Sequence, residues 1–427
     1  MLTAPHPEGN DILVVGAGAA GLFAATWAGR SAVAAGKQLS ISALDSARKL
    51  GAKILVAGGG RCNVTHETVS EADYAGSTPA AIRKVLRRFG VDECVRFFGE
   101  AGVFFKREET GKLFPVTDSA RTVLEALVKE ATRAGVNLVH PAKVTAVAKT
   151  DAGFAVTTDA ATFLTRRVIL CTGGKSLPKS GSDGSGFELA RSLGHSLTSP
   201  IVPALVPLVV PTGHWITSLS GLTLDTQVTL HAASSKKLFQ TTGSTLCTHV
   251  GLSGPAILDV SRHWLMAKAA DPEVSLSLNW LPGEREESLD RVFVERQGRG
   301  ALAILRERLP DRLARSLCEQ AGAPTTGDLP RDARRKLVAI VVATPLPITG
   351  DRGFSVAEAT AGGVPLAEVK LETMESRVCP GLYLAGEVLD VDGRIGGFNF
   401  QWAWASGFVA GSAAGRAAAA ASIATTS

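Results

Sequence analysis

The sequence predicts an α/β protein in which a parallel sheet is interrupted by an inserted domain. Its 427 residues correspond to two or three domains at roughly 150 residues each. Short apolar runs followed by glycine occur at 11–16, 167–174 and 381–387, the last of which ends in Gly-Glu. Such runs are typical of strands buried on both faces of a parallel sheet. The residues between the second and third run do not continue this pattern of apolar runs. We therefore expect them to form the insertion, and we expect one sheet assembled from both ends of the chain.

Glycine is over-represented in a chain that is otherwise typical of a globular protein. It supplies 45 residues, and hydrophobic side chains make up 45% of the chain. The usual glycine share is about 7%. The excess has no three-residue period, which excludes collagen, and the apolar content excludes disorder. The glycines are therefore expected at particular places in the fold.

The first element combines a strand at 11–15, a glycine turn at 16–21 and a helix at 22–29. The turn has the GxGxxG spacing. Its first glycine permits the tight turn, its second lets the backbone approach a pyrophosphate, and its third lets the helix pack on the strand. The helix N-terminus offers N–H groups and partial positive charge to phosphates. The candidate dinucleotide contacts here are Gly16, Gly18, Ala19, Ala20 and Gly21.

A carboxylate follows the next predicted strand. The apolar run 39–44 ends at Asp45, close to the roughly 20-residue distance at which a ribose-binding acid follows the glycine turn. The turn and the acid together predict a dinucleotide site, but they do not distinguish FAD from NAD.

Three later segments continue this pattern. The run 167–174 is a buried strand that ends in Thr-Gly-Gly, and 381–387 is a strand that ends in Gly-Glu. After a polar loop, Gly396-Gly-Phe-Asn399 opens an apolar helix over 395–415. With the glycine turn, these segments resemble the two-dinucleotide-binding-domain flavoproteins, in which one sheet holds FAD and its last strand and helix come from the far end of the chain.

The loop Gly51-Ala-Lys-Ile-Leu-Val-Ala-Gly-Gly-Gly-Arg-Cys-Asn-Val-Thr65 narrows the resemblance. It is similar to the GxKxxxxGGGRCNxT loop of the HI0933/YhiN-like family of FAD-dependent oxidoreductases (BaiN/aminoacetone-oxidase type). The resemblance extends from about residue 11 to 416. One departure is Asp45, where the family commonly has Glu; either carboxylate can accept hydrogen bonds from ribose hydroxyls.

The resemblance implies a Rossmann-like FAD-binding domain of the glutathione-reductase type, interrupted by an inserted β-barrel plus helical domain. It also implies that Glu387 bonds a ribityl hydroxyl of FAD, and that the N–H groups around Gly397 and Phe398 face the flavin pyrimidine. A helix N-terminus there stabilises negative charge on reduced flavin. The further FAD contacts that it implies are Lys53, Gly59, Gly60, Arg61, Cys62, Asn63, Thr172, Gly173, Gly174, Gly386, Gly396 and Asn399.

Two residues of this loop are the catalytic candidates. Cys62 is the loop's single cysteine, which disfavours the dithiol relay of disulfide reductases. It is either a proton donor near the flavin or a small buried residue in a tight loop. Arg61 either holds a phosphate or anionic substrate or forms a structural salt bridge. The six cysteines show no metal-ligand spacing, and no metal is expected.

The split motif predicts the domain boundaries. The FAD-binding domain comprises residues 1–196 and 344–427, and the insertion is β-rich over 197–280 and helical over 281–343. An uncharged stretch at 12–29 lacks the basic flank of a signal peptide, so we expect a cytoplasmic protein without stable membrane association. The oligomeric state is left open.

An arginine-rich segment bears on the partners. It contains Arg296, Arg299, Arg306, Arg308, Arg312 and Arg315 against Glu307 and Asp311. This face either binds RNA or is a solvated surface, and the net charge of +5 does not decide between them. The substrate is therefore either a small molecule or RNA.

The predicted reaction is hydride transfer through flavin N5. The resemblance implies NAD(P)H-linked reduction of an activated C=C bond, including uridine to dihydrouridine in ribosomal RNA, or oxidation of a small amine such as aminoacetone. A binding protein with structural FAD is the third hypothesis. No second strand–GxGxxG–helix unit is present in the sequence, so NAD(P)H would reach the flavin directly as a transient reductant.

Overall fold

The computed structural model describes residues 9–296 and 298–424. The chain forms two compact units, one made of Met1–Pro203 with Glu358–Ser427 and the other of Ala204–Ala357. Both junctions lie further along the chain than the predicted 196/197 and 343/344. The segment after 196 stays with the first unit because Thr198 donates its hydroxyl to Asp390 Oδ2 at 2.7 Å and its N–H to the Gly363 carbonyl at 2.9 Å.

The first unit is built on a mixed sheet with strand order β20-β21-β22-β10-β1-β2-β7. Its parallel strands are β22 (Leu382–Leu384), β10 (Thr162–Leu170), β1 (Asn10–Val15), β2 (Ile41–Leu44) and β7 (Val136–Val139). An antiparallel edge is formed by β20 (Val369–Lys370) and β21 (Glu375–Ser376), and the hairpin β8 (Val144–Thr150) and β9 (Gly153–Thr158) joins at β10. The predicted mixed α/β Rossmann-like fold is confirmed.

Strand β1 is central because its side chains are apolar on both faces. Ile12, Leu13 and Val14 are fully buried between β10 and β2. The principal helices of this unit are α1 (Ala19–Ala34), α2 (Ala52–Val56), α3 (Pro79–Leu86), α4 (Val91–Glu100), α5 (Ala120–Arg133), α6 (Ser185–Ser192) and α12 (Phe398–Ala424). Small strands add β3 (Thr65–His66), β6 (Lys112–Pro115) and β5 (Phe105–Arg107), the pair β23 (Val391–Gly393) and β4 (Tyr74–Gly76), and the pair β11 (Val202–Ala204) and β19 (Ala359–Ala361).

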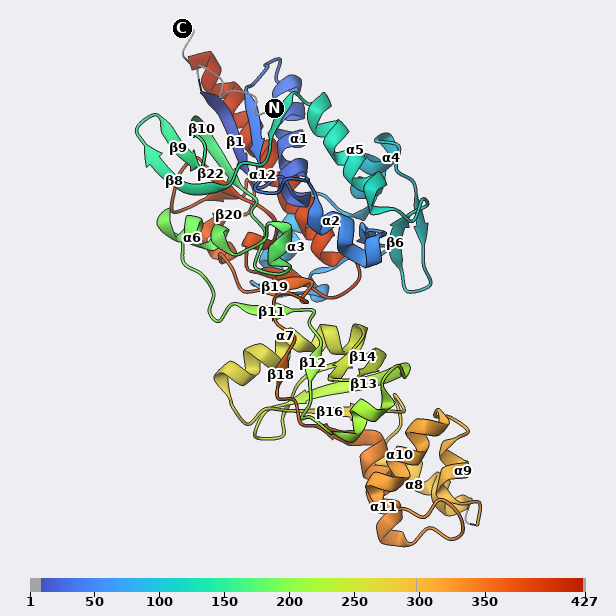
Figure 1. Ribbon diagram of the computed structural model, residues 1–427. Helices are drawn as coiled ribbons and strands as arrows, with labels where there is room; N and C mark the ends of the chain where they lie inside the picture. Colours follow the sequence, from blue (N-terminus) through green and yellow to red (C-terminus); the bar gives the residue numbers. More distant parts are fainter. Residues whose placement is uncertain (1–8, 297, 425–427) are drawn as a thin grey trace. The chain divides into compact units, whose positions relative to one another are not determined.

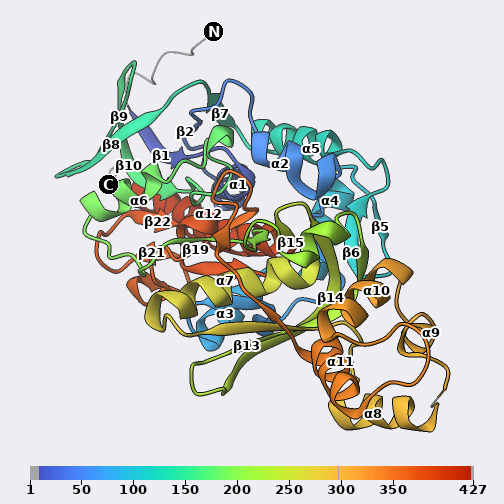
Figure 2. The same cartoon turned by 60° about the horizontal axis from the view of Figure 1, so that its bottom comes forward.

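Helices α1 and α12 come from opposite ends of the chain and lie side by side (Figures 1 and 2). Glycines at four-residue intervals on α12 face alanines at four-residue intervals on α1. A Cβ added at Gly411 would lie 2.1 Å from the Ala24 carbonyl oxygen, and one at Gly415 would lie 2.4 Å from that of Ala28. These glycines therefore set the close approach of the two backbones, which aligns both helix N-termini with the same end of the sheet.

Aromatic side chains fill the space between α1, α4 and α12. Phe23 packs against Phe97 with ring centroids 4.6 Å apart and against Trp404 at 5.3 Å. The indole N–H of Trp404 donates to the Val64 carbonyl at 2.9 Å. The core of the first unit is thus anchored to the chain just after the predicted cofactor loop.

The second unit contains an antiparallel sheet with order β17-β16-β13-β14-β15-β12-β18. Its strands are β12 (Leu208–Val209), β13 (Thr223–His231), β14 (Lys237–Thr248), β15 (Gly251–Ser253), β16 (Ser275–Asn279), β17 (Thr344–Leu346) and β18 (Gly350–Asp351). Among the described strands, no pairing joins β17 to β18, so the sheet is open and the predicted barrel is not confirmed. Helix α7 (Pro255–Ala270) also interrupts the part that the sequence predicts as β-rich.

The helical part of this unit comprises α8 (Glu286–Glu295), α9 (Ala301–Leu305), α10 (Asp311–Ala321) and α11 (Arg331–Ala343). Strands and helices share one hydrophobic core, which includes Leu278 of β16 and Val341 of α11. The indole N–H of Trp280 donates to Thr344 Oγ1 at 2.6 Å. In the portion of the chain that the structure describes, every helix is too short or too polar to cross a bilayer.

Candidate functional site

The predicted cofactor segments follow four neighbouring strands. Gly16 comes directly after β1, Asp45 after β2, Thr172 shortly after β10 and Gly386 shortly after β22. These strands are parallel and adjacent in the order β22-β10-β1-β2. Their carboxyl ends therefore meet at one edge of the sheet, where open α/β sheets bind their ligands.

The three glycines of the turn meet three different requirements. Gly16 has φ +94°, a conformation that L side chains rarely adopt. A Cβ at Gly21 would lie 1.7 Å from the Gly16 carbonyl oxygen, whereas a Cβ at Gly18 would meet no heavy atom within 4 Å. The protein itself therefore requires Gly16 and Gly21, but it leaves room beside Gly18. That room fits a pyrophosphate at the α1 N-terminus.

The C-terminal segment closes against this helix. A Cβ at Gly386 would lie 2.7 Å from the Ala20 methyl, and Gly386 has φ +78°. The Gly386 carbonyl accepts from the Trp402 indole N–H at 3.2 Å, and its N–H donates to Ser406 Oγ at 2.9 Å. Gly386 is thus fixed between α1 and α12, next to Ala20.

Asp45 is tied to the glycine turn. Its Oδ2 accepts from the Ala17 N–H and its Oδ1 from the Ala47 N–H, both at 2.8 Å. Burial raises the pKa of this carboxyl, against the lowering effects of the Ala47 and Ala17 hydrogen bonds and the His140 charge. Each carboxylate oxygen can accept more than one hydrogen bond, so Asp45 retains capacity for ribose hydroxyls.

Lys53 and Glu387 meet in a polar network. Lys53 Nζ lies 2.5 Å from Glu387 Oε2 and 2.6 Å from Ser176 Oγ. Glu387 Oε1 accepts from Ser176 Oγ at 3.0 Å and from the Thr360 N–H at 2.8 Å. A carboxylate offers about four acceptor positions, and three are used here. The network therefore orients Glu387 and leaves room for one more donor, such as a ribityl hydroxyl.

Buried polar atoms without partners provide a test of whether FAD fits. Among the described residues, Thr172 Oγ1, Ser182 Oγ and Asn63 Oδ1 are buried and have no hydrogen-bond partner. Ser182 Oγ lies 2.7 Å from where a Cβ of Gly173 would stand, and Asn63 Oδ1 lies 2.9 Å from that of Gly397. Buried polar groups in native proteins are nearly always hydrogen-bonded. Thr172 and Asn63 belong to the predicted cofactor segments and Ser182 adjoins Gly173, so all three atoms are consistent with FAD contacts.

The loop before β3 is built from left-handed residues. Gly58, Gly59, Gly60 and Cys62 all have positive φ, and a Cβ at Gly59 would meet nothing within 4 Å. Arg61 is already paired. Its guanidinium lies 2.6 Å from Glu108 and 4.0 Å from the centroid of the Phe114 ring. The structure thus shows the salt bridge, and a contact of Arg61 with substrate stays a prediction.

Cys62 is a fully buried thiol. Burial raises its pKa to about 12, and burial also raises that of the neighbouring Cys94. A thiol with this pKa remains protonated at neutral pH and transfers its proton poorly. The geometry therefore favours a packing role for Cys62.

We expect iodoacetamide at pH 8 to leave Cys62 unmodified in the folded protein. With a pKa of about 12, roughly one molecule in 10,000 carries the reactive thiolate, against about a quarter for an ordinary cysteine. Peptide mass spectrometry after a timed reaction measures the modification, and guanidinium-unfolded protein is the positive control. Rapid alkylation of Cys62 in the native protein would show that the thiol is accessible and activated.

The residues before α12 form a compact loop. Gly396 and Gly397 have φ of +134° and +92°, and a Cβ at Gly397 would lie 2.8 Å from the Thr65 carbonyl oxygen. Asn399 donates to the Gly393 carbonyl and accepts from its N–H, both at 2.9 Å. Phe398 stacks on His66 with centroids 5.0 Å apart. Asn399 and Phe398 therefore shape the loop, while the contact of the 397–398 N–H groups with flavin stays a prediction.

Several residues at this edge of the sheet were not predicted. Ser176, Ser182 and Thr360 join the network or adjoin Gly173. Ser176 and Ser182 lie close after Thr-Gly-Gly and could have been suspected from that position, but Thr360 arrives through β19 and gives no local signal. Desolvation raises the pKa of the Glu358 carboxyl, and the charges of Lys112 and Lys53 oppose this rise.

His195 has a structural role. Its ring is buried, with Nδ1 2.7 Å from Glu368 Oε2 and Nε2 2.9 Å from Ser376 Oγ. Both ring nitrogens therefore have hydrogen-bond partners within the protein. Within the described residues, no group of three or more His, Cys, Asp or Glu side chains is placed to hold a metal ion.

Comparison with known proteins identifies the family. The model of the HI0933-like protein Rossmann domain matches residues 10–413. The chain belongs to this family. A relative from Clostridium scindens, 3-dehydro-bile acid delta(4,6)-reductase, is 37% identical over 413 residues, covering 95% of this chain and 99% of that protein. The ribosomal RNA dihydrouridine synthase of Escherichia coli is 32% identical over 404 residues, covering 93% and 96%.

The HI0933-like chain is an FAD-dependent oxidoreductase, as the sequence predicts. Among solved structures, a flavocytochrome c3 fumarate reductase aligns with 96% of this chain and 78% of its own, with a TM-score of 0.45 and 14% identity. The individual FAD contacts and the use of NAD(P)H remain predictions.

Proposed function

We propose that this protein reduces a C=C bond conjugated to a carbonyl group, with a reduced nicotinamide nucleotide as electron donor. The observation that carries the proposal is the near-complete coverage of the chain by two relatives whose names denote such reductions. A delta-4,6 dienone and the uracil ring share an alkene polarised by a carbonyl. In each, addition of one hydride to the β-carbon and of one proton to the α-carbon reduces that one alkene.

The chain's own residues support binding and orientation for this chemistry. Bound FAD supplies hydride at N5. The α1 N-terminus and the room beside Gly18 support pyrophosphate binding, and the Lys53–Glu387 network holds a cation and an oriented carboxylate at the same edge of the sheet. Because Cys62 is a poor acid, the proton for the α-carbon is expected from another group or from water.

The arginine-rich segment is only partly neutralised by ion pairs. Arg299 lies 2.9 Å from Glu307, Arg308 lies 2.5 Å from Glu284, and Arg312 donates to the Ser218 carbonyl at 2.6 Å. The other arginines pair as well, Arg296 with Glu307, and Arg306 and Arg315 with Asp311. These pairs are exposed and exchange readily with solvent. The six arginines share three carboxylates, Glu284, Glu307 and Asp311, so the segment keeps an excess of three positive charges, and its ion pairs alone do not distinguish an RNA-binding face from a solvated surface.

Two half-reactions test the proposal. Anaerobic NADPH or NADH is expected to bleach the flavin absorbance. A cyclic α,β-unsaturated ketone or unmodified ribosomal RNA is then expected to restore it, with one equivalent of saturated product per flavin. Mass spectrometry of the product identifies the reduced bond.

The two acceptors distinguish the substrate class. Reoxidation by the enone alone indicates a small-molecule reductase, whereas loss of dihydrouridine from ribosomal RNA in cells without the gene indicates RNA. The proposal is wrong if reduced enzyme reacts with neither acceptor but oxygen and an amine yield peroxide. That result would establish the amine oxidase that the sequence left open.

A further inference from the structure

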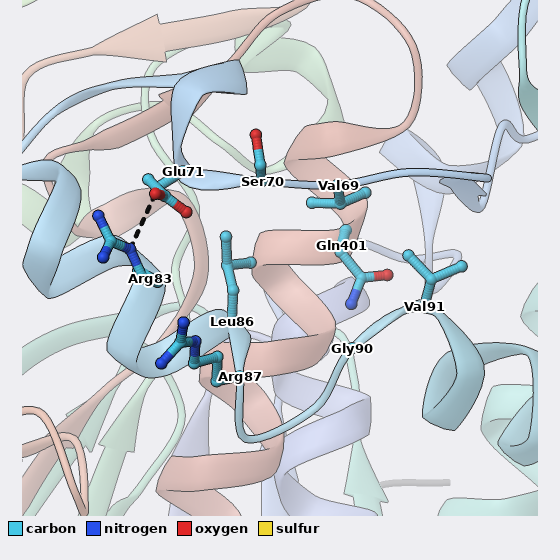
Figure 3. Close-up of a pocket in the computed structure, with 9 residues that line it drawn as sticks. All are labelled: Val69, Ser70, Glu71, Arg83, Leu86, Arg87, Gly90, Val91 and Gln401. Atoms are coloured by element: carbon cyan, nitrogen blue, oxygen red, sulfur yellow. Dashed lines mark hydrogen bonds and ion pairs between the residues drawn. The ribbon is translucent and has the colours of Figure 1, made fainter.

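A cavity of about 400 Å³ opens in the first unit, among helices α3, α4 and α12. Its walls are the segment before and within η2 (Glu71–Asp73), the end of α3, the loop to α4 and one residue of α12 (Figure 3). This volume is within the range of small-ligand pockets. The lining residues are Val69, Ser70, Glu71, Arg83, Leu86, Arg87, Gly90, Val91 and Gln401.

The charges of the cavity are not balanced. Arg83 Nε donates to Glu71 Oε1 at 2.8 Å. The Glu71 backbone N–H donates a hydrogen bond to the Glu71 carboxylate, and this bond is the largest cause that lowers the pKa of that carboxyl. The charges of Arg83 and Arg87 lower the pKa further. Over 9–296 and 298–424, the Arg87 guanidinium has no ion pair or hydrogen bond with another side chain. With Glu71 neutralising one of the two arginines, a single positive charge faces the cavity.

The remaining surface combines apolar walls with a fixed polar floor. Val69, Leu86 and Val91 supply aliphatic contacts, and Figure 3 shows Leu86 between the arginines and Gln401. Gln401 is buried, and its amide is held at both ends. Its Oε1 accepts from Thr65 Oγ1 at 2.7 Å, and its Nε2 donates to the Phe89 carbonyl at 2.9 Å. The cavity is therefore preformed, which lowers the entropic cost of binding.

We propose that this cavity is a binding site for a small organic anion with an apolar body. The Arg87 guanidinium, with Arg83 beside it, would hold a carboxylate or a phosphate through charge-assisted hydrogen bonds. The apolar body would lie against Val69, Leu86 and Val91. None of these side chains is among the FAD contacts predicted above.

Calorimetric titration of the FAD-loaded protein tests the site directly. The probes are benzoate and phenyl phosphate, which distinguish a carboxylate from a phosphate head group, with neutral benzyl alcohol as the uncharged probe. We expect saturable binding of at least one anion with one-to-one stoichiometry. Arg87→Ala is expected to weaken it at least tenfold, and benzyl alcohol is expected to bind more weakly than the anion.

Two further variants complete the test. Arg88→Ala removes a neighbouring exposed cation that does not line the cavity, and it is expected to leave binding unchanged. Val91→Phe keeps both arginines but occupies the cavity, and it is expected to weaken binding. The proposal is overturned if neither anion binds saturably, or if Arg87→Ala and Arg88→Ala have equal effects. Because the readout is binding, the proposal stands or falls independently of the reductase activity.

Discussion

Replacing Gly18 with valine is expected to give a folded protein that no longer retains FAD. The backbone at Gly18 is extended, with φ −78° and ψ −160°, which valine tolerates. A Cβ there would meet no protein atom within 4 Å, so the cost to folding is limited to a poorer helix N-cap, about 1 kcal/mol. The branched side chain instead fills the room that the pyrophosphate needs.

The expected loss of FAD affinity is at least a hundredfold, or about 2.8 kcal/mol. Absorbance of the purified protein gives the FAD occupancy, and titration of the apoprotein gives Kd. Circular dichroism checks the fold. Purified Gly18→Val protein with full FAD occupancy and unchanged Kd would contradict the assignment of this turn to the pyrophosphate.

Two other glycines provide matched controls. Gly350 in β18 also has open space around its Cβ position and no left-handed φ, so Gly350→Val is expected to fold and retain FAD. Gly21→Val places a Cβ 1.7 Å from the Gly16 carbonyl oxygen and is expected to prevent folding. The three variants separate a glycine that the ligand requires from one that the fold requires and from one that neither requires.

The sequence predicted the sheet edge well because its signals are local. Three strands precede the glycine turn, Thr-Gly-Gly and Gly-Glu. Each of these strands is a short apolar run, and the residues that follow it have a defined backbone requirement. Placing such runs in one parallel sheet brings Gly16, Asp45, Thr172 and Gly386 to the same end. The family resemblance added Lys53 and Glu387, whose contact spans most of the chain and has no periodic signal.

Features that depend on tertiary context escaped prediction. Thr360 enters the Lys53–Glu387 network only because the chain returns from the second unit through β19. Alternating residues in the insertion correctly suggested strands, but alternation does not determine whether a sheet closes, and the sheet is open. The cavity lined by Arg87 and Gln401 lies among helices α3, α4 and α12, and its lining residues share no sequence pattern.

Substituting alanine for Gly411 is expected to destabilise the first unit, although alanine is the better helix former. The gain in helix propensity is about 1 kcal/mol. Against it, the new Cβ would lie 2.1 Å from the Ala24 carbonyl oxygen and 2.9 Å from its Cα. The overlap is relieved only if the α1 and α12 backbones separate, and this separation loses packing along the whole contact between the two helices. Overpacking of this kind costs about 1–3 kcal/mol, and the 2.1 Å approach to backbone favours the upper end of that range, so we expect a net loss of up to about 2 kcal/mol.

Gly99 gives the opposite expectation for the same substitution. It lies within α4, and a Cβ there would meet nothing within 4 Å, so Gly99→Ala retains the propensity gain and stabilises the unit by up to about 1 kcal/mol. Differential scanning calorimetry of FAD-loaded protein measures both, with shifts of about 2–4 °C per kcal/mol. If both alanines raise the midpoint, the helices do not require close approach at Gly411. Midpoint shifts of opposite sign would show that tertiary packing, and not helix propensity, requires the small residues between α1 and α12. These residues bring the two helix N-termini to the cofactor edge of the sheet.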